Sequence, residues 1–242
     1  EGSPESIDRV LCMHIDVWTD IACPWCYLGV RHLRQALSTF ERKEEVSVRL
    51  HAYLLQPELD QTLNESEPDY LARTKGMSRA EVDQVLSSLT ELARKDGIDI
   101  DWEGVKVAPT TSAHRLVGLA REIDMERDTT MGSDTLELKV HEALQRARFQ
   151  LGMDVSNPES LIAIARDFDI PGDRVLATLE SQDSAGEVFS DFQIGVQMGI
   201  GAVPVFIFDK ALMMEGAQPR IAFENALNTA WNHANLDSPV GE

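Results

Sequence analysis

The spacing of apolar residues changes twice along this chain, from a strand pattern to a helical pattern and back to a strand pattern. Residues 14–20, HIDVWTD, favour a strand, and residues 46–53, VSVRLHAY, alternate strictly between apolar and polar side chains, which is the pattern of a strand with two different faces. The stretch between them carries apolar side chains at helical spacing, namely Tyr27, Leu33, Leu37 and Phe40. The start of the chain therefore predicts a strand, a helix and a second strand.

A long helical region follows. From about residue 61 to 184 the apolar side chains recur at helical spacing. Ser78 and Glu81 form a capping box, and Asn157 before Pro158 marks another helix start. These apolar stripes predict a helical core rather than a cofactor site.

The strand pattern returns near the end of the chain. Residues 203–216, VPVFIFDKALMMEG, predict two short strands around a turn at Asp209-Lys210, and a last helix follows Pro219. A βαβ unit and a ββα unit can share one sheet while a helical block is inserted between them. We therefore expect an α/β fold. The expected boundaries are 1–13 for a flexible extension, 14–60 together with 185–242 for the sheet domain, and 61–184 for the inserted α-helical domain.

The composition limits the partners of the chain. Its net charge of −19 argues against nucleic acid, because phosphate backbones are bound by basic surfaces. No apolar run approaches the roughly 18–20 residues that span a bilayer. The first residues, EGSPESIDRV, lack the basic start and apolar middle of a secretion signal. We therefore expect a soluble, cytoplasmic protein without a membrane partner.

Two of the three cysteines lie close together in DIACPWCYLG, residues 20–29, where the first strand runs into the first helix. Pro24 suits the first helical position, which leaves Cys23 at the helix start. There the first-turn amides and the helix dipole favour a thiolate. Cys26, one turn further on, can reach the first sulfur. The motif thus predicts an attacking cysteine, Cys23, and a resolving one, Cys26.

Two neighbours of the cysteines bear on the redox potential. Trp25 adds no positive charge beside Cys23, so we expect a less oxidising couple than one with a histidine there. Asp20 would act in the same direction by like-charge repulsion if it were close to Cys23. Its position just before the motif, however, is typical of a solvated turn residue.

A second element lies far away in sequence, at residues 199–208, GIGAVPVFIF. A proline that starts a strand just after a glycine-marked turn is a place where a cis bond can occur. A cis bond at Val203-Pro204 next to Cys23 would leave the Val203 backbone free to pair with an extended substrate. These two residues are therefore our candidates for substrate binding.

These motifs together resemble the DsbA-like thioredoxin-fold oxidoreductases, specifically the FrnE branch. The matching segments are DVWTDIACPWCYLG (16–29), Leu55-Gln56-Pro57, AHRL (113–116), GAVPVFIF (201–208) and EGAQP (215–219). The resemblance implies a thioredoxin fold with an inserted α-helical domain, and a catalytic Cys23–Cys26 pair that faces a cis Pro204. The chain departs from the pattern at Thr110-Thr111, usually Asn-Thr, and at Arg148, often tyrosine. These departures concern substrate preference more than chemistry.

Other interpretations of the same residues remain open. Cys12, His14, Cys23 and Cys26 are ligand types that could bind zinc. Glutathione transferases of the kappa class and 2-hydroxychromene-2-carboxylate isomerases resemble this chain too, but usually have serine in place of the first cysteine. A redox-independent peptide-binding chaperone is the third alternative.

Two further features favour structural roles or leave the choice open. His114, in a helix with an apolar stripe, is more typical of a packing residue than of a catalytic one. Gly216–Pro219 could hold a small carboxylate at a helix start or form a simple cap.

The sequence as a whole predicts a thiol–disulfide oxidoreductase. Cys23 and Cys26 are the catalytic pair, Pro24 and Trp25 shape the site, and we expect no metal. We expect no tightly bound cofactor, with a low-molecular-weight thiol such as glutathione as a candidate redox partner. The expected partners are protein or small-molecule thiols and disulfides, and the expected assembly is a monomer or a homodimer.

Overall fold

The computed structural model describes residues 12–236, with side chains described up to residue 233. It contains a mixed sheet in the order β2-β1-β3-β4, in which β1 and β2 are parallel and the other pairs antiparallel. The strands are β1 (Met13–Thr19), β2 (Val46–Ala52), β3 (Val205–Phe208) and β4 (Leu212–Glu215).

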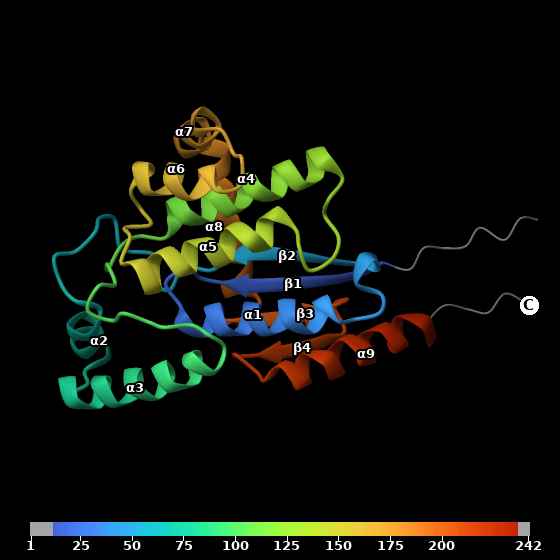
Figure 1. Cartoon of the computed structure of the whole chain (residues 1–242), viewed down its shortest axis with the longest axis horizontal. Helices are drawn as coiled ribbons and strands as arrows, with labels where there is room; N and C mark the ends of the chain where they lie inside the picture. The colour runs from blue at the N-terminus through green and yellow to red at the C-terminus, as the bar shows by residue number, and fades with distance from the viewer. Residues whose placement is uncertain (1–11, 237–242) are drawn as a thin grey trace, which may run out of the picture.

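Nine α-helices are described among residues 12–236, and most of them lie between β2 and β3 in the sequence. They are α1 (Pro24–Ser38), α2 (Glu67–Lys75), α3 (Arg79–Lys95), α4 (Thr111–Arg127), α5 (Leu136–Leu151), α6 (Pro158–Arg166), α7 (Gly172–Glu180), α8 (Gln182–Gln197) and α9 (Arg220–Leu236). Figure 1 shows α4 and α5 above the sheet, and α2 and α3 as a hairpin at one end of the molecule. The predicted strand–helix–strand, helical block and strand–strand–helix order is confirmed.

Local sequence signals explain several element boundaries. The predicted capping box at Ser78 and Glu81 starts α3, and the Asn157 side chain accepts two backbone N–H bonds at the start of α6. Asp209 and Lys210 lie in the predicted turn, with φ values of 47° and 59°. The connection is one residue longer than predicted, since Ala211 also lies between the end of β3 at Phe208 and the start of β4 at Leu212. Left-handed conformation at both turn positions matches the twist of the hairpin strands.

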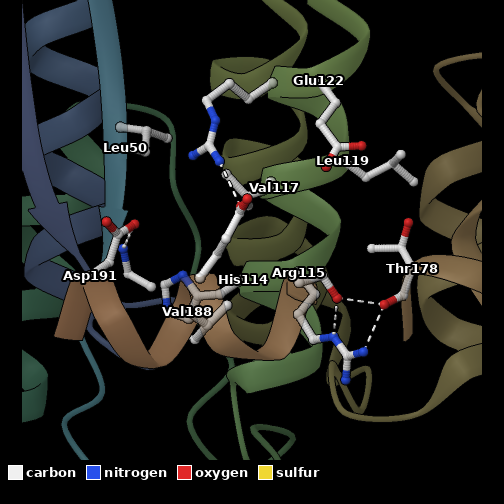
Figure 2. Close-up of a pocket in the computed structure, with 14 residues that line it drawn as sticks. Leu50, His114, Arg115, Val117, Leu119, Glu122, Thr178, Val188 and Asp191 are labelled. Atoms are coloured by element: carbon white, nitrogen blue, oxygen red, sulfur yellow. Dashed lines mark hydrogen bonds and ion pairs between the residues drawn. The ribbon is translucent and has the colours of Figure 1, made fainter. Parts of the chain in front are cut away.

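Helix α8 is tied to the neighbouring helices by polar contacts. Arg115 of α4 donates hydrogen bonds to the Ser184 hydroxyl and to the carbonyls of Thr178 and Ser181, as Figure 2 shows in part. The hollow drawn there has a volume of about 20 Å³, which is room for about one water molecule. It is therefore a packing defect rather than a ligand site.

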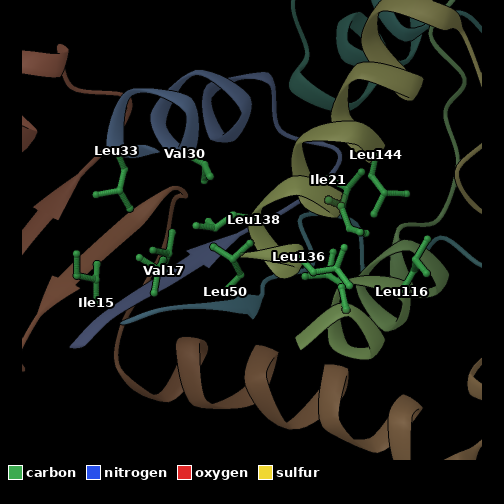
Figure 3. Packing of buried hydrophobic residues seen from close by; sticks show 14 of the residues in the cluster. Ile15, Val17, Ile21, Val30, Leu33, Leu50, Leu116, Leu136, Leu138 and Leu144 are labelled. Atoms are coloured by element: carbon green, nitrogen blue, oxygen red, sulfur yellow. The ribbon is translucent and has the colours of Figure 1, made fainter. Parts of the chain in front are cut away.

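One face of the sheet packs into a large apolar core (Figure 3). Ile15 and Val17 of β1 and Leu50 of β2 point into it and are almost fully buried. Helices from both parts of the sequence complete it with Val30 and Leu33 of α1 and Leu138 of α5. The inserted helices therefore share a single core with the sheet.

The opposite face of the sheet packs against α8. Trp18 of β1 and Ile207 of β3 lie in a separate cluster that also contains both Cys23 and Cys26. Gly195 of α8 permits this contact, because a Cβ there would lie 2.7 Å from Cδ1 of Trp18. The cysteines themselves belong to the start of α1, so this cluster extends past the end of β1 to the first turn of that helix.

Two expected boundaries need correction. Met13, expected in the flexible extension, is the first residue of β1, where it is buried and paired with Val46. The rest of that expected extension, residues 1–11, lies outside the described residues. The boundary expected at residue 184 falls inside α8, because this helix runs to Gln197 and packs against β2.

Candidate active site

Cys23 caps the N-terminus of α1. Its backbone is extended, with φ −97° and ψ 113°, and Pro24 follows as the first helical residue. The Cys23 carbonyl accepts hydrogen bonds from the N–H groups of Cys26 and Tyr27 at 3.1 and 3.3 Å. The Cys23 thiol donates to the Val203 carbonyl oxygen at 3.5 Å. The sulfur thus lies at the helix start and next to the loop before β3, as the sequence predicts.

Cys26 lies one turn into α1 and is fully buried. Burial, and next the adjacent Cys23 thiol, raise the pKa of Cys26 well above its usual value. The backbone N–H of Asp20 donates to its sulfur at 3.4 Å. Both cysteines are free, buried thiols: Cys23 lies at the helix start with 5% of its surface exposed, while Cys26 is fully buried below it and stays protonated because its pKa is raised.

The loop before β3 is packed closely against α1. The Val203–Pro204 bond is cis. Gly29 of α1 faces the proline ring, and a Cβ at this glycine would lie only 2.8 Å from Pro204 Cγ. The Tyr53 hydroxyl donates to the Ile200 carbonyl at 2.9 Å, which fixes the loop from the other side.

Asp20 is buried beneath the cysteines, which corrects the interpretation of a solvated turn residue. Its carboxylate accepts hydrogen bonds from the N–H groups of Ala22 and Leu55, from the Thr110 hydroxyl at 2.8 Å and from His114 Nε2 at 3.2 Å. Burial alone would raise the pKa of Asp20, but these donors, His114 foremost, outweigh it and lower the pKa. The site therefore contains a buried negative charge.

His114 lies on α4, where its side chain is buried and hydrogen-bonded to Asp20 just after β1. This agrees with the packing role predicted for it, although its partner is the active-site carboxylate of Asp20 rather than a distant group. Thr110, one of the departures from the resembled pattern, binds the same carboxylate.

Two polar residues of α5 also reach the site, and no sequence motif points to either. Gln145 donates to the carbonyls of Asp20 and Cys23 at 3.2 and 3.3 Å. His141 Nε2 lies 3.1 Å from the Thr19 hydroxyl. Burial, followed by the nearby His114, lowers the pKa of His141 to about 3, so this imidazole is neutral.

A wide pocket opens beside Cys23, with a volume of about 550 Å³. Its walls come from the cysteine motif, the segment after β2 and the α2–α3 hairpin. Trp25 is one of the lining residues and remains 41% exposed. Part of the apolar stripe on α3 predicted as core faces this pocket instead, since Val85 is 50% exposed.

The four candidate zinc ligands do not meet. Cys12 and His14 lie at the start of β1, and a strand of this length separates them from Cys23 and Cys26 by about 20 Å. Within residues 12–236, no cluster of three or more His, Cys, Asp or Glu side chains is arranged to hold a metal ion.

The polar groups of the Gly216–Pro219 segment are hydrogen-bonded within the protein. The Gln218 side chain donates to the Glu215 carbonyl, and the Gln218 carbonyl lies 2.7 Å from His32 Nδ1. This arrangement favours the cap over a carboxylate site. Arg148, the second departure from the resembled pattern, is fully buried and paired with Glu67 at 2.9 Å.

Residues 14–228 match the family described as the DSBA-like thioredoxin domain, and the chain belongs to this family. The predicted thioredoxin fold with inserted helices is thereby confirmed. None of the described helices is long and apolar enough to cross a membrane.

Several solved structures are similar to this one. A probable DsbA oxidoreductase from Streptomyces coelicolor has 27% identity and a TM-score of 0.80, covering 95% of this chain and 93% of that chain. The cytosolic disulfide reductase DsbM from Pseudomonas aeruginosa has 17% identity and a TM-score of 0.61, covering 91% and 99%. A 2-hydroxychromene-2-carboxylate isomerase has 14% identity and a TM-score of 0.62, covering 93% and 100%. No curated protein matches the sequence.

Proposed function

We propose that this protein is a thiol–disulfide oxidoreductase that works through Cys23 and Cys26 by a mixed-disulfide intermediate. The observation that carries the proposal is the placement of Cys23 at the start of α1, beside the Val203 carbonyl, with the buried Cys26 thiol one turn below. A helix start favours a thiolate at the first position. The Cys26 thiol below it stays protonated, and therefore unreactive, until the first disulfide has formed.

The proposed reaction balances without a further reagent. The Cys23 thiolate attacks one sulfur of a substrate disulfide, so a Cys23–substrate disulfide forms and the other substrate sulfur leaves and takes up a proton. Cys26 then loses its proton and attacks the Cys23 sulfur, which releases the second substrate thiol. Two electrons pass from the dithiol to the substrate, and the reverse sequence oxidises a substrate dithiol.

The surroundings assign roles to the other predicted site residues. Val203 and Pro204 border Cys23 just before the start of β3, where the Val203 backbone can align an extended substrate. Pro24 sets the helix start, and Trp25 lines the adjacent pocket. The less oxidising couple expected from Trp25 and Asp20 stays a prediction, which a measured redox potential tests.

Two related structures guide the choice of redox partner and compartment. DsbM from Pseudomonas aeruginosa is a cytosolic disulfide reductase and has also been solved with glutathione, at 16% identity to this chain. We therefore keep glutathione as a candidate electron donor and the cytoplasm as the proposed location. Neither proposal requires a tightly bound cofactor.

The first experiment is a thiol-trapping titration across a series of glutathione redox buffers, with each cysteine measured by mass spectrometry. We expect one reversible two-electron transition confined to Cys23 and Cys26, while Cys12 titrates independently. Its midpoint gives the direction of electron flow, since ~30 mV corresponds to ~1.4 kcal/mol for two electrons.

Substitutions then test the order of attack. Cys23→Ser should abolish disulfide exchange, and Cys26→Ser should accumulate mixed disulfides on Cys23. Cys12→Ser is the matched control and should behave as the parent protein. Adducts that form on Cys12 instead, or exchange that survives Cys23→Ser, would exclude this mechanism, because another thiol would then carry the reaction.

A further inference from the structure

The pocket beside Cys23 is separate from the strand edge at Val203. Its lining includes Cys23, Pro24 and Trp25 but neither Val203 nor Pro204. A substrate bonded to Cys23 therefore has two different surfaces within reach. One is the backbone of the loop before β3, and the other is this pocket of about 550 Å³.

Most of the pocket wall is apolar. The side chains that form it come from the cysteine motif, the segment after β2 and α3, and they include Trp25, Leu55, Val82, Val85, Leu86 and Leu89. Three of them remain open to solvent, since Trp25 is 41%, Leu55 44% and Val85 50% exposed. Apolar surface in contact with water at a concave site gains free energy when an apolar ligand covers it.

The charged groups of the lining do not suit an anion. Glu58 and Glu67 contribute two carboxylates, while Lys75 is the single cationic group among the residues that line the pocket. Arg148 lies behind Glu67 and is already paired with it at 2.9 Å. The pocket therefore disfavours a ligand with several carboxylates, such as glutathione, on this side of Cys23.

The helices that form the pocket are anchored to the rest of the fold. Leu89 and Ala93 of α3 pack with Tyr27 and Leu28 of α1 in one buried cluster. The Trp102 indole donates to the Thr90 hydroxyl at 2.8 Å, which ties the segment after α3 back onto the helix. The α3 wall of the pocket is thus held in place by packing against α1 and by the bond from Trp102.

We propose that this pocket selects substrates of Cys23 that carry a bulky apolar group within a few bonds of the reacting sulfur. This inference rests on the proposed oxidoreductase function and names the class of disulfide that it uses. The apolar group occupies the space between Trp25 and α3 while its sulfur reacts with Cys23. Such a group belongs either to a small lipophilic thiol or to a cysteine next to an aromatic residue in a peptide.

The test compares two small disulfides that differ only in the group beyond the second carbon, bis(2-phenylethyl) disulfide and bis(2-hydroxyethyl) disulfide. Both release primary alkyl thiols, so the leaving groups are similar. Each rate with the reduced protein is divided by the rate of dithiothreitol with the same disulfide. We expect the normalised rate with the phenyl compound to be more than tenfold higher.

Two capped dipeptide disulfides, built from Phe-Cys and Ser-Cys, form the second arm of the experiment. A preference for the phenylalanine compound would assign the pocket to peptide substrates as well. A preference confined to the phenylethyl compound would assign it to small thiols. Equal normalised rates within both pairs would overturn the proposal.

Substitutions in the pocket test whether the pocket causes the preference for the phenyl compound. Val85→Asp places a charge in the pocket and should lower the phenyl-to-hydroxyl ratio at least fivefold, and Val85→Asn should lower it without adding charge. Val196→Asp on α8 is the matched control, because Val196 is also a helical valine that is 50% exposed. Circular dichroism checks that each variant is folded. A ratio that Val85→Asp and Val85→Asn leave unchanged would contradict the proposal.

Failure of this inference can be told from failure of the proposed function. If both disulfides oxidise Cys23 and Cys26 at the same normalised rate, the dithiol chemistry stands and only the pocket assignment is wrong. If neither disulfide oxidises the pair, the oxidoreductase function itself is wrong.

Discussion

The two faces of the sheet differ in composition and in what they hold. The face that packs on α1, α5 and α9 is almost wholly apolar, with Val17, Leu50 and Phe206 inside one large core. The face that packs on α8 mixes apolar and ionisable groups. There Trp18 stacks on the His51 ring at 4.3 Å, and the ring lies between two carboxylates.

The difference shows how one small sheet serves stability and chemistry together. The apolar face joins the sheet to helices from both ends of the sequence, so it holds the fold as a unit. The mixed face borders the site, because the cluster that contains Trp18 extends to Cys23 and Cys26 at the start of α1. Changes on the first face should therefore reduce stability most, and changes on the second should affect the site and its pH response.

The largest expected effect on stability comes from a comparison of one residue from each face of the sheet. Phe206 of β3 is fully buried against Phe223 of α9, with the ring centroids 4.8 Å apart. Phe206→Ala should lower the free energy of unfolding by about 3–5 kcal/mol, and Ile207→Ala, on the opposite face of the same strand, by about 2 kcal/mol. Urea unfolding followed by circular dichroism measures both.

The control for this pair is Met213→Ala in β4, where the side chain is 50% exposed. It should change the free energy of unfolding by less than about 0.5 kcal/mol. A larger loss for Ile207→Ala than for Phe206→Ala would contradict the view that the α9-facing side dominates stability.

The next effect concerns the fit of α8 on the mixed face. A Cβ at Gly195 would meet Trp18 Cδ1 at 2.7 Å and Tyr53 Cδ2 at 3.2 Å. Gly195→Ala should therefore lower the free energy of unfolding by about 1–3 kcal/mol, despite the better helix propensity of alanine. Thermal and urea unfolding measure the change.

Gly186 offers a matched control in the same helix, because a Cβ there has no atom within 4 Å. Gly186→Ala should raise the free energy of unfolding by about 0.5–1 kcal/mol through helix propensity alone. If the two alanine variants were stabilised equally, α8 would not be in tight contact with Trp18.

The smallest effect is the pH dependence of the mixed face. Burial opposes the charged form of His51, but hydrogen bonds to Asp16 at 2.7 Å and Asp191 at 2.9 Å outweigh it and raise its pKa. Its contribution to stability is fully present below the unfolded pKa of about 6.5 and is lost as pH rises through the folded pKa. Arg49, the nearby cation, weakens this effect.

The two carboxylates respond in the opposite direction. The pKa of Asp16 is lowered, chiefly by its hydrogen bond to His51, and that of Asp191 is lowered because the bond to His51 outweighs burial. Their contribution is present above about pH 3.9 and is lost as pH falls. The cluster should therefore stabilise the protein most between about pH 4 and 6.5.

His51→Gln tests this dependence. The free energy of unfolding of the variant, measured in urea from pH 5 to 9, should fall less with rising pH than that of the parent. Glu137, whose pKa burial raises to about 7, titrates in both proteins and cancels in the difference. Parallel curves for the two proteins would show that His51 is not charged between its carboxylates.

Much of the fold could be predicted because its signals are local. The alternation in residues 46–53, the capping box at Ser78 and the turn at Asp209-Lys210 each fix the conformation of a few neighbouring residues. The Cys-Pro-Trp-Cys motif is also a local signal, because Pro24 and its neighbours determine the helix start that positions both sulfurs. For such features, the local backbone preferences and the structure agree.

The environment of these residues was decided by tertiary structure. Asp20 was expected in solvent, and its burial depends on donors from Leu55, Thr110 and His114, which lie far away in the chain. Val85 belongs to the apolar stripe between residues 61 and 184 that predicts a helical core, but in the structure it lies in the wall of the pocket and is 50% exposed. No local pattern records where a distant helix will pack.

The sequence by itself thus determined the element order, the two thiols and their spacing, because these depend on near neighbours along the chain. Only the tertiary structure decided that a charged Asp20 lies beneath the thiols and that an apolar pocket opens beside them. The burial of a side chain, the hydrogen bonds to a buried charge and the shape of a cavity each depend on residues that are far apart in sequence. These properties therefore arise only when the chain has folded.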